Sequence, residues 1–143
     1  MKKILLLFML VLFMGCSNKG LSFDEYQKII KQTIFVIPDS LMTKEQLLLN
    51  VKIYDFLNQH IYVENNCLKL SVGKESLTKE GIPIIYYDVI KYQLEENNEG
   101  IKKLIESGEI PAKHLDQNSL LKEYKVRYKE IDRPRMIELL ESK

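Results

Sequence analysis

An unbroken apolar run extends from Ile4 to Phe13, after two lysines and just before Gly15 and Cys16. A basic start, a short apolar run and a small residue at its end are typical of a secretory signal. The run is too short for a transmembrane helix, which needs about 20 apolar residues to cross a bilayer. We therefore expect residues 1–15 to be a removable signal peptide.

Beyond this run, the hydrophobic positions follow helical spacing at first. Ser22 and Glu25 match a capping box and predict a helix that begins there. A second possible box, Thr43 with Gln46, predicts another helix, which we expect to end near His60. Its apolar positions cover more than one face, so this helix should be buried on several sides.

The pattern then changes to strands. The residues 61–64 and 67–72 are β-prone and flank Asn65 and Asn66, which tolerate the positive φ of a two-residue hairpin turn. A short helix over about 74–79 should follow. Because an isolated hairpin is marginally stable in water, we expect a third strand elsewhere.

A long apolar segment comes next. The residues 83–97 are apolar on nearly all sides, as is typical of a central helix. Asn97, Asn98 and Gly100 have poor helix propensity, so we expect a break or kink there. A separate helix is then predicted over about 99–107.

Two hydrophobic patterns overlap between residues 120 and 131. Leu120, Tyr124, Tyr128 and Ile131 share a helical face, whereas Tyr124, Val126 and Tyr128 alternate with basic residues as in an edge strand. Both interpretations stay open. We favour the strand, because it would supply the third strand of the sheet.

A terminal helix is predicted from Asp132 and Pro134 through Leu140. Together the elements predict an α+β fold, with helices packed on a small antiparallel sheet of two or three strands, after an N-terminal signal segment. Residues 16–20 would be a spacer, and residues 21–143 a single globular domain. That length is sufficient for one hydrophobic core.

The balance of charged residues limits the kinds of molecule that we expect this protein to bind. The chain has 21 basic and 20 acidic residues, and loss of the signal would remove Lys2 and Lys3. The near balance argues against a nucleic-acid-binding protein, which concentrates positive charge. No P-loop, GxSxG, HExxH, CxxC or Rossmann glycine motif occurs, so we expect no cofactor.

Gly15 and Cys16 resemble the lipobox that ends the signal of bacterial lipoprotein precursors. The resemblance implies that Cys16 carries a diacylglycerol thioether, that the chain is cut before it, and that acyl chains such as palmitate hold the protein at the cell-envelope membrane. Ser17 implies the periplasmic face of the outer membrane if the source is Gram-negative. An ordinary secretory signal is the alternative. Residues 68–98 also resemble a segment of uncharacterised small bacterial lipoproteins, which implies no activity.

The second cysteine, Cys67, would have no cysteine partner in an acylated chain, so we expect no internal disulfide. A nucleophilic role would need a base such as His60 or His114 to lower its pKa. A small buried residue in a strand is the interpretation that we favour. The two histidines have no further ligand at metal-binding spacing, so we expect no metal site.

Charged side chains offer two further hypotheses. Glu95, Glu96 and Glu99 are candidates for general acid–base chemistry on a glycan, although a solvated helix face explains them better. A basic stretch would contact anionic lipid if it lay on one side of a strand, but protection of a sheet edge is the interpretation that we favour. Its residues are Lys122, Lys125, Arg127, Lys129, Arg133 and Arg135.

Tyrosines are frequent, and we expect most to pack in the core, although tyrosine is also enriched at interfaces. Those considered are Tyr62, Tyr86, Tyr87, Tyr92, Tyr124 and Tyr128.

The sequence favours a non-catalytic module that binds an envelope protein, as an inhibitor, an immunity-type protein or an accessory subunit. The alternative is a small envelope enzyme or a carrier acting on glycan or lipid. A flat exposed apolar patch would favour the first. A deep pocket would favour the second.

Overall fold

The computed structural model of the chain describes residues 20–111 and 116–143. Its strands form an antiparallel pair among helices, so the predicted α+β class is confirmed. The predicted signal peptide lies outside the described residues. In chain order the elements are α2 (Phe23–Ile30), η2 (Ile34–Val36), η3 (Asp39–Leu41), α3 (Lys44–His60), β1 (Ile61–Glu64), β2 (Cys67–Leu70), α4 (Lys74–Lys79), α5 (Ile85–Glu106), α6 (Gln117–Arg127), the π-helical turn η5 (Tyr128–Asp132) and α7 (Arg133–Glu141).

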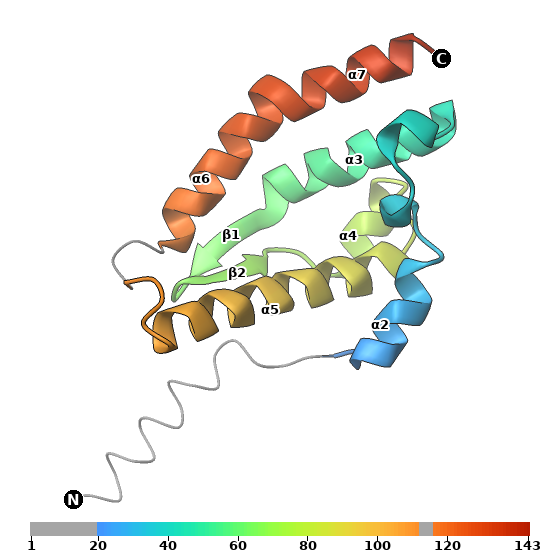
Figure 1. Cartoon of the computed structure of the whole chain (residues 1–143). Coiled ribbons are helices and arrows are strands. Elements are labelled where there is room, and N and C mark those ends of the chain that lie inside the picture. The colour runs from blue at the N-terminus through green and yellow to red at the C-terminus, as the bar shows by residue number, and fades with distance from the viewer. Residues whose placement is uncertain (1–19, 112–115) are drawn as a thin grey trace, which may run out of the picture.

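The helices run in three rows (Figure 1). Helix α3 passes directly into β1 and forms the middle row, α5 lies on one side of it beside β2, and α6 and α7 follow each other on the other side. Helix α2 packs against α5 at the end opposite the hairpin turn. No helix of the described part is both long and apolar enough to cross a membrane.

Both predicted capping boxes are confirmed. The Ser22 hydroxyl accepts the Glu25 N–H, and the Glu25 carboxylate accepts the Ser22 N–H, at the start of α2. Thr43 and Gln46 form the same pair of bonds at the start of α3, which ends at His60 as expected. These reciprocal bonds satisfy main-chain donors that a helix start otherwise leaves unpaired.

The predicted hairpin is also confirmed. Strands β1 and β2 are antiparallel, and Glu64 pairs with Cys67 across the turn. Asn65 and Asn66 have φ values of 51° and 58°, so both turn residues are left-handed, as a type I′ turn requires. The helix expected over residues 74–79 follows as α4.

The prediction of a third strand between residues 120 and 131 is wrong. This segment forms α6 and the turn η5, and no third strand occurs in residues 20–111 and 116–143. The helical spacing prevails because Tyr128 is buried at 2% exposure, while Val126, on the same face of the hypothetical strand, is 47% exposed. The expected row of basic side chains on one side of a strand is therefore also wrong.

Helix α6 joins α7 through the π-helical turn, where the Arg133 N–H bonds the Tyr128 carbonyl. Pro134 follows and lacks an N–H, so an ordinary helical bond cannot form there. Asp55 of α3 holds this junction: it accepts the Tyr128 hydroxyl at 2.8 Å and the Arg133 guanidinium at 2.9 and 3.2 Å. Burial and Asp55 raise the pKa of Tyr128, which keeps the hydroxyl protonated as a donor.

The predicted break in the long apolar segment is wrong as well. Helix α5 continues through Asn97, Asn98 and Gly100 to Glu106. Gly100 is exposed, and its lower helix propensity costs only about 1 kcal/mol. Asn98 is buried and is held by contacts outside its own helix, described below.

The main hydrophobic core lies between α3, the hairpin, α4 and α5. Tyr86, Tyr92 and Tyr128 are buried, as expected of core tyrosines, while Tyr62 is exposed. Tyr86 also accepts the Ile34 N–H at 3.0 Å, which ties η2 to α5. The buried cluster consists of Ile34, Met42, Leu47, Ile53, Phe56, Leu57, Ile61, Leu77, Ile82, Tyr86 and Ile90.

A candidate ligand groove

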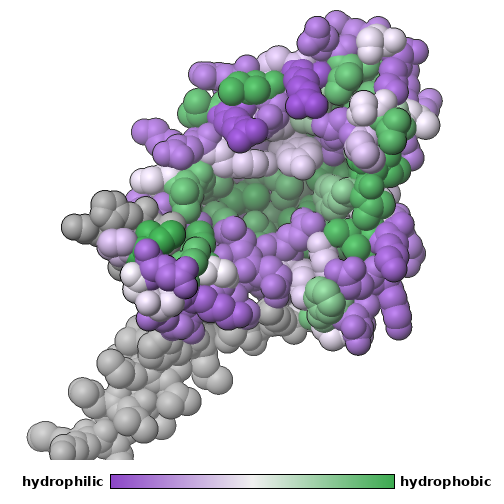
Figure 2. Space-filling view, viewed as in Figure 1, coloured by the Kyte–Doolittle hydropathy of each residue, from purple (hydrophilic) through white to green (hydrophobic). Residues whose placement is uncertain are grey.

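A cavity of about 390 Å³ opens between α5 and α6. We call it the α5–α6 groove. Its floor comes from the end of α3 and from the hairpin, and Figure 2 shows it as a green hollow bordered by hydrophilic side chains. The apolar side chains of α3, the hairpin and α5 that line it are Leu57, Ile61, Leu68, Ile90, Leu94 and Ile101.

The second wall, α6, contributes Leu120, Leu121 and Tyr124. Burial and the neighbouring Tyr54 and Asp132 raise the pKa of Tyr124, so this hydroxyl stays neutral. Among the described residues that line the groove, none carries a charged side chain. The polar lining consists of three amides: Gln93, Asn97 and Gln117.

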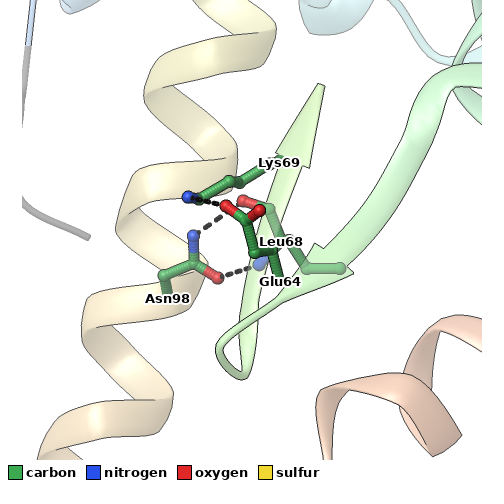
Figure 3. A network of polar contacts seen from close by, with 4 residues as sticks. All are labelled: Glu64, Leu68, Lys69 and Asn98. Carbon is green, nitrogen blue, oxygen red and sulfur yellow. Dashed lines mark hydrogen bonds and ion pairs between the residues drawn. The ribbon is translucent and has the colours of Figure 1, made fainter. Parts of the chain in front are cut away.

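The hairpin is fixed to α5 by the side chain of Asn98 (Figure 3). Its Oδ1 accepts the Leu68 N–H at 2.8 Å, and its Nδ2 donates to the Leu68 carbonyl at 2.9 Å. In an antiparallel pair, alternate residues direct both main-chain groups away from the partner strand. The Asn98 amide therefore takes the place that a third strand would have beside Leu68.

The start of α6 is held by the hairpin turn. The Gln117 N–H donates to Asn66 Oδ1 at 2.9 Å, while Asp116 caps the same helix by accepting the Asn118 N–H at 3.0 Å. Main-chain donors at a helix start need such partners. The turn that closes the hairpin thus also places one wall of the groove.

Gln117 is the most enclosed polar residue of the groove, with 1% exposure. Its Nε2 donates to Asn98 Oδ1 at 3.5 Å, a long hydrogen bond. Its Oε1 is buried and has no hydrogen-bond partner among the described residues. Buried acceptors are rarely left unpaired in proteins.

The predicted acylation site, Cys16, lies outside the described residues. Cys67 begins β2, is buried and is disulfide-bonded, which contradicts the expectation of no disulfide at this residue; its partner lies outside the described part. A disulfide sulfur is not a thiolate nucleophile.

The histidines do not form a site with Cys67. His60 lies at the opposite end of the hairpin, where its Nδ1 is 3.4 Å from Ser71 Oγ and its ring contacts Phe56. His114 lies outside the described residues. No cluster of three or more His, Cys, Asp or Glu side chains suited to a metal ion occurs in residues 20–111 and 116–143.

The three candidate carboxylates are not gathered in one cavity. Glu95 lines a hollow near Gly20, whereas Glu99 lines another beside the hairpin turn. Glu96 is exposed. The basic residues are likewise dispersed: Arg127 pairs with Asp132, and Arg133 pairs with Asp55 on α3.

Sequence reasoning missed the two residues that organise the groove. Asn98 was interpreted as a helix breaker, and Gln117 was not considered. The sequence did offer one signal for Asn98, which is an amide side chain within an apolar helical segment. A polar side chain that is buried in such a segment requires a hydrogen-bond partner elsewhere in the fold.

Asn98→Ala should lower the free energy of unfolding by about 2–3 kcal/mol, because both main-chain groups of Leu68 lose their partners. Urea denaturation measures this change. Asn97→Ala is the matched control on an adjacent exposed position, and it should change stability by less than about 0.5 kcal/mol. Equal effects of the two substitutions would show that Asn98 does not hold the hairpin.

No known protein family matches the chain, and neither a curated protein nor a solved structure is significantly similar to it.

Proposed function

We propose that this protein is a lipid-anchored, non-catalytic binding module of the bacterial cell envelope, and that the α5–α6 groove is its binding site. The lipobox-like Gly15 and Cys16 support the anchor. Acyl chains on Cys16 would hold the module at the membrane, on the periplasmic face of the outer membrane in a Gram-negative cell.

The observation that carries the binding role is the groove's uncharged, apolar lining. Small-molecule sites typically have volumes of about 300–1,000 Å³ and mostly apolar walls with few polar groups. The groove, at about 390 Å³ with three amides, fits this description. Covering its apolar walls would remove them from water, which favours an apolar occupant. The module would then act as a carrier of a lipid-like molecule.

The position of Gly20 supports an accessible groove. Gly20 lines a hollow with Asp88 and Tyr92 of α5, whereas Ile90 and Leu94 of the same helix line the groove. At 100° per residue these pairs lie on opposite helix faces. The short spacer before Gly20 reaches at most roughly 13 Å. The anchor would therefore enter on the side away from the groove.

An envelope protein is the second candidate partner, and exposed apolar side chains favour it. Phe23, Val36, Leu41 and Ile84 are all more than half exposed. They belong to α2, η2, η3 and the residue before α5, which lie at one end of the molecule (Figure 1). An inhibitor, an immunity-type protein or an accessory subunit would use such a surface.

Radiolabelled palmitate should be incorporated into the chain in growing bacteria, and Cys16→Ala should abolish the label and leave an uncleaved precursor. Fluorography and membrane fractionation measure both results. One sulfur cannot hold both a thioether and a disulfide, so the acylated form that we propose would lack the disulfide of Cys67. Cys67→Ala is therefore the matched control and should keep the label. An unlabelled wild-type chain would contradict the proposed anchor.

Groove binding is testable with N-phenyl-1-naphthylamine, an uncharged probe whose fluorescence rises in apolar sites. The mature chain with Cys16→Ser, residues 16–143, should bind this probe. Leu94→Trp should weaken binding at least tenfold, about 1.4 kcal/mol, by filling the groove. Ile84→Trp, at an exposed position outside the groove, should leave binding unchanged. Equal binding by both variants would place the probe elsewhere, and no binding by the parent chain would refute the proposed site.

A further inference from the structure

We infer that a second cavity, distinct from the α5–α6 groove, binds an uncharged sugar. This cavity has a volume of about 390 Å³ and lies where η3 and α3 face the junction of α6 with α7 (Figure 1). We call it the tyrosine pocket, because Tyr54, Tyr124 and Tyr128 line it. Tyr124 also lines the groove, but no other described residue lines both cavities. The inference therefore does not depend on whether the groove binds a ligand.

The first step is that two phenol hydroxyls of the pocket are available to a ligand. The hydroxyls of Tyr54 and Tyr124 make no hydrogen bond among the described residues, and neither belongs to the enclosed unpaired atoms of that part of the chain. Both side chains are half-buried. Tyr128 differs, because its hydroxyl already donates to Asp55. Two polar groups of the pocket thus have unused hydrogen-bonding capacity and remain in contact with solvent.

The second step is that these hydroxyls lie close to two carboxylates. Burial and the charges of Asp39 and Asp132 raise the pKa of Tyr54. Burial, Tyr54 and Asp132 raise the pKa of Tyr124. Because the interaction between charges weakens with distance, these four side chains, which all line the pocket, are near neighbours around it. Each hydroxyl stays protonated, so it can both donate a hydrogen bond to a ligand and accept one.

The third step concerns the charge of the ligand. Among the described lining residues, the two carboxylates are balanced by the guanidinium groups of Arg127 and Arg135. Arg127 pairs with Asp132 at 3.5 Å, and Asp39 Oδ1 accepts the Asn50 amide at 3.4 Å. A ligand anion would meet both carboxylates, and a ligand cation would meet both guanidinium groups. Since an uncompensated charge is costly to bury, this lining favours an uncharged ligand.

The fourth step is that a sugar ring carries the groups that this lining can bind. Its hydroxyls donate and accept, so they can pair with guanidinium, carboxylate and phenol groups at the same time. Its C–H faces are apolar, and Met136 and the tyrosine rings supply apolar surface. Tyr128 stacks on Tyr54 and on Tyr124, with ring centroids 5.8 and 6.5 Å apart, so the rings form one aromatic wall.

The volume of the pocket also fits a small ligand, because such sites typically measure about 300–1,000 Å³. An amino acid or a short peptide would be neutral overall as well. Each of its ends, however, would bring a full charge into the pocket, and that charge would have to lose its water. An uncharged sugar avoids this cost.

The test titrates the full chain with single sugars and follows its N–H signals by NMR. Glucose, galactose, mannose and N-acetylglucosamine are the uncharged probes, while glucosamine and glucuronate carry an ammonium or a carboxylate on a similar ring. At least one uncharged sugar should bind about tenfold more tightly than both charged sugars. It should shift the signals of Tyr54, Tyr124 and Arg135, and leave that of Ile101 in the groove unchanged.

Two variants that make the same chemical change locate the site. Tyr54→Phe removes one hydroxyl and keeps the ring, so binding of that sugar should weaken about fivefold, as expected for one lost hydrogen bond. Tyr62→Phe makes this change on β1, outside the pocket, and should leave binding unchanged. The comparison of sugars on the unsubstituted chain decides the inference even if Tyr54→Phe fails to fold.

Several results would overturn the inference. Tighter binding of glucosamine or glucuronate would show that the pocket takes a charged ligand, and tighter binding of the dipeptide alanyl-alanine would assign it to a zwitterion. Equal binding by Tyr54→Phe and the parent chain would place the sugar elsewhere. If no uncharged sugar shifts the signals of the pocket, the proposed site is refuted. None of these results bears on the groove, which the fluorescent probe tests separately.

Discussion

The two hydrogen bonds between the Asn98 side chain and the main chain of Leu68 are the interaction on which the site depends. A two-stranded hairpin leaves main-chain groups unpaired at both edges, and it is marginal alone. The side chain of Asn98, which lies on α5, pairs with the N–H and the carbonyl of Leu68 at the open edge of β2. The hairpin is thereby fixed to a long helix, and α6 is fixed in turn through Asn66 and Gln117.

The end of α6 that adjoins α7 has a second polar anchor. Asp55 on α3 receives Tyr128 and Arg133 at the π-helical turn, where Pro134 prevents regular helical bonding. With one anchor at the hairpin and another on α3, α6 is held away from α5 at a fixed distance. The space left between the two helices is the groove, so these polar contacts, some of them made by lining residues such as Leu68 and Gln117, contribute to its shape.

Local signals predicted the local structure well. The capping boxes and the Asn65-Asn66 turn were identified because each depends on residues within a few positions of one another. The hydrogen bonds of Asn98 could not be predicted in this way, because its partner Leu68 is thirty positions away in the sequence. The same limit explains the error at α6: helical and strand spacing overlapped, and burial of Tyr128 against α3 decided between them. The groove needs segments from five elements (α3, β1, β2, α5 and α6), so no single sequence pattern indicated it.

The exchange rate of the Leu68 amide proton with solvent tests the central claim most directly. Hydrogen–deuterium exchange, followed by NMR, reports whether this N–H is bonded. We predict that it exchanges as slowly as the amides paired between β1 and β2, because Asn98 accepts it. Exchange as fast as an exposed edge-strand amide would contradict the account, since the hairpin would then not be held by α5.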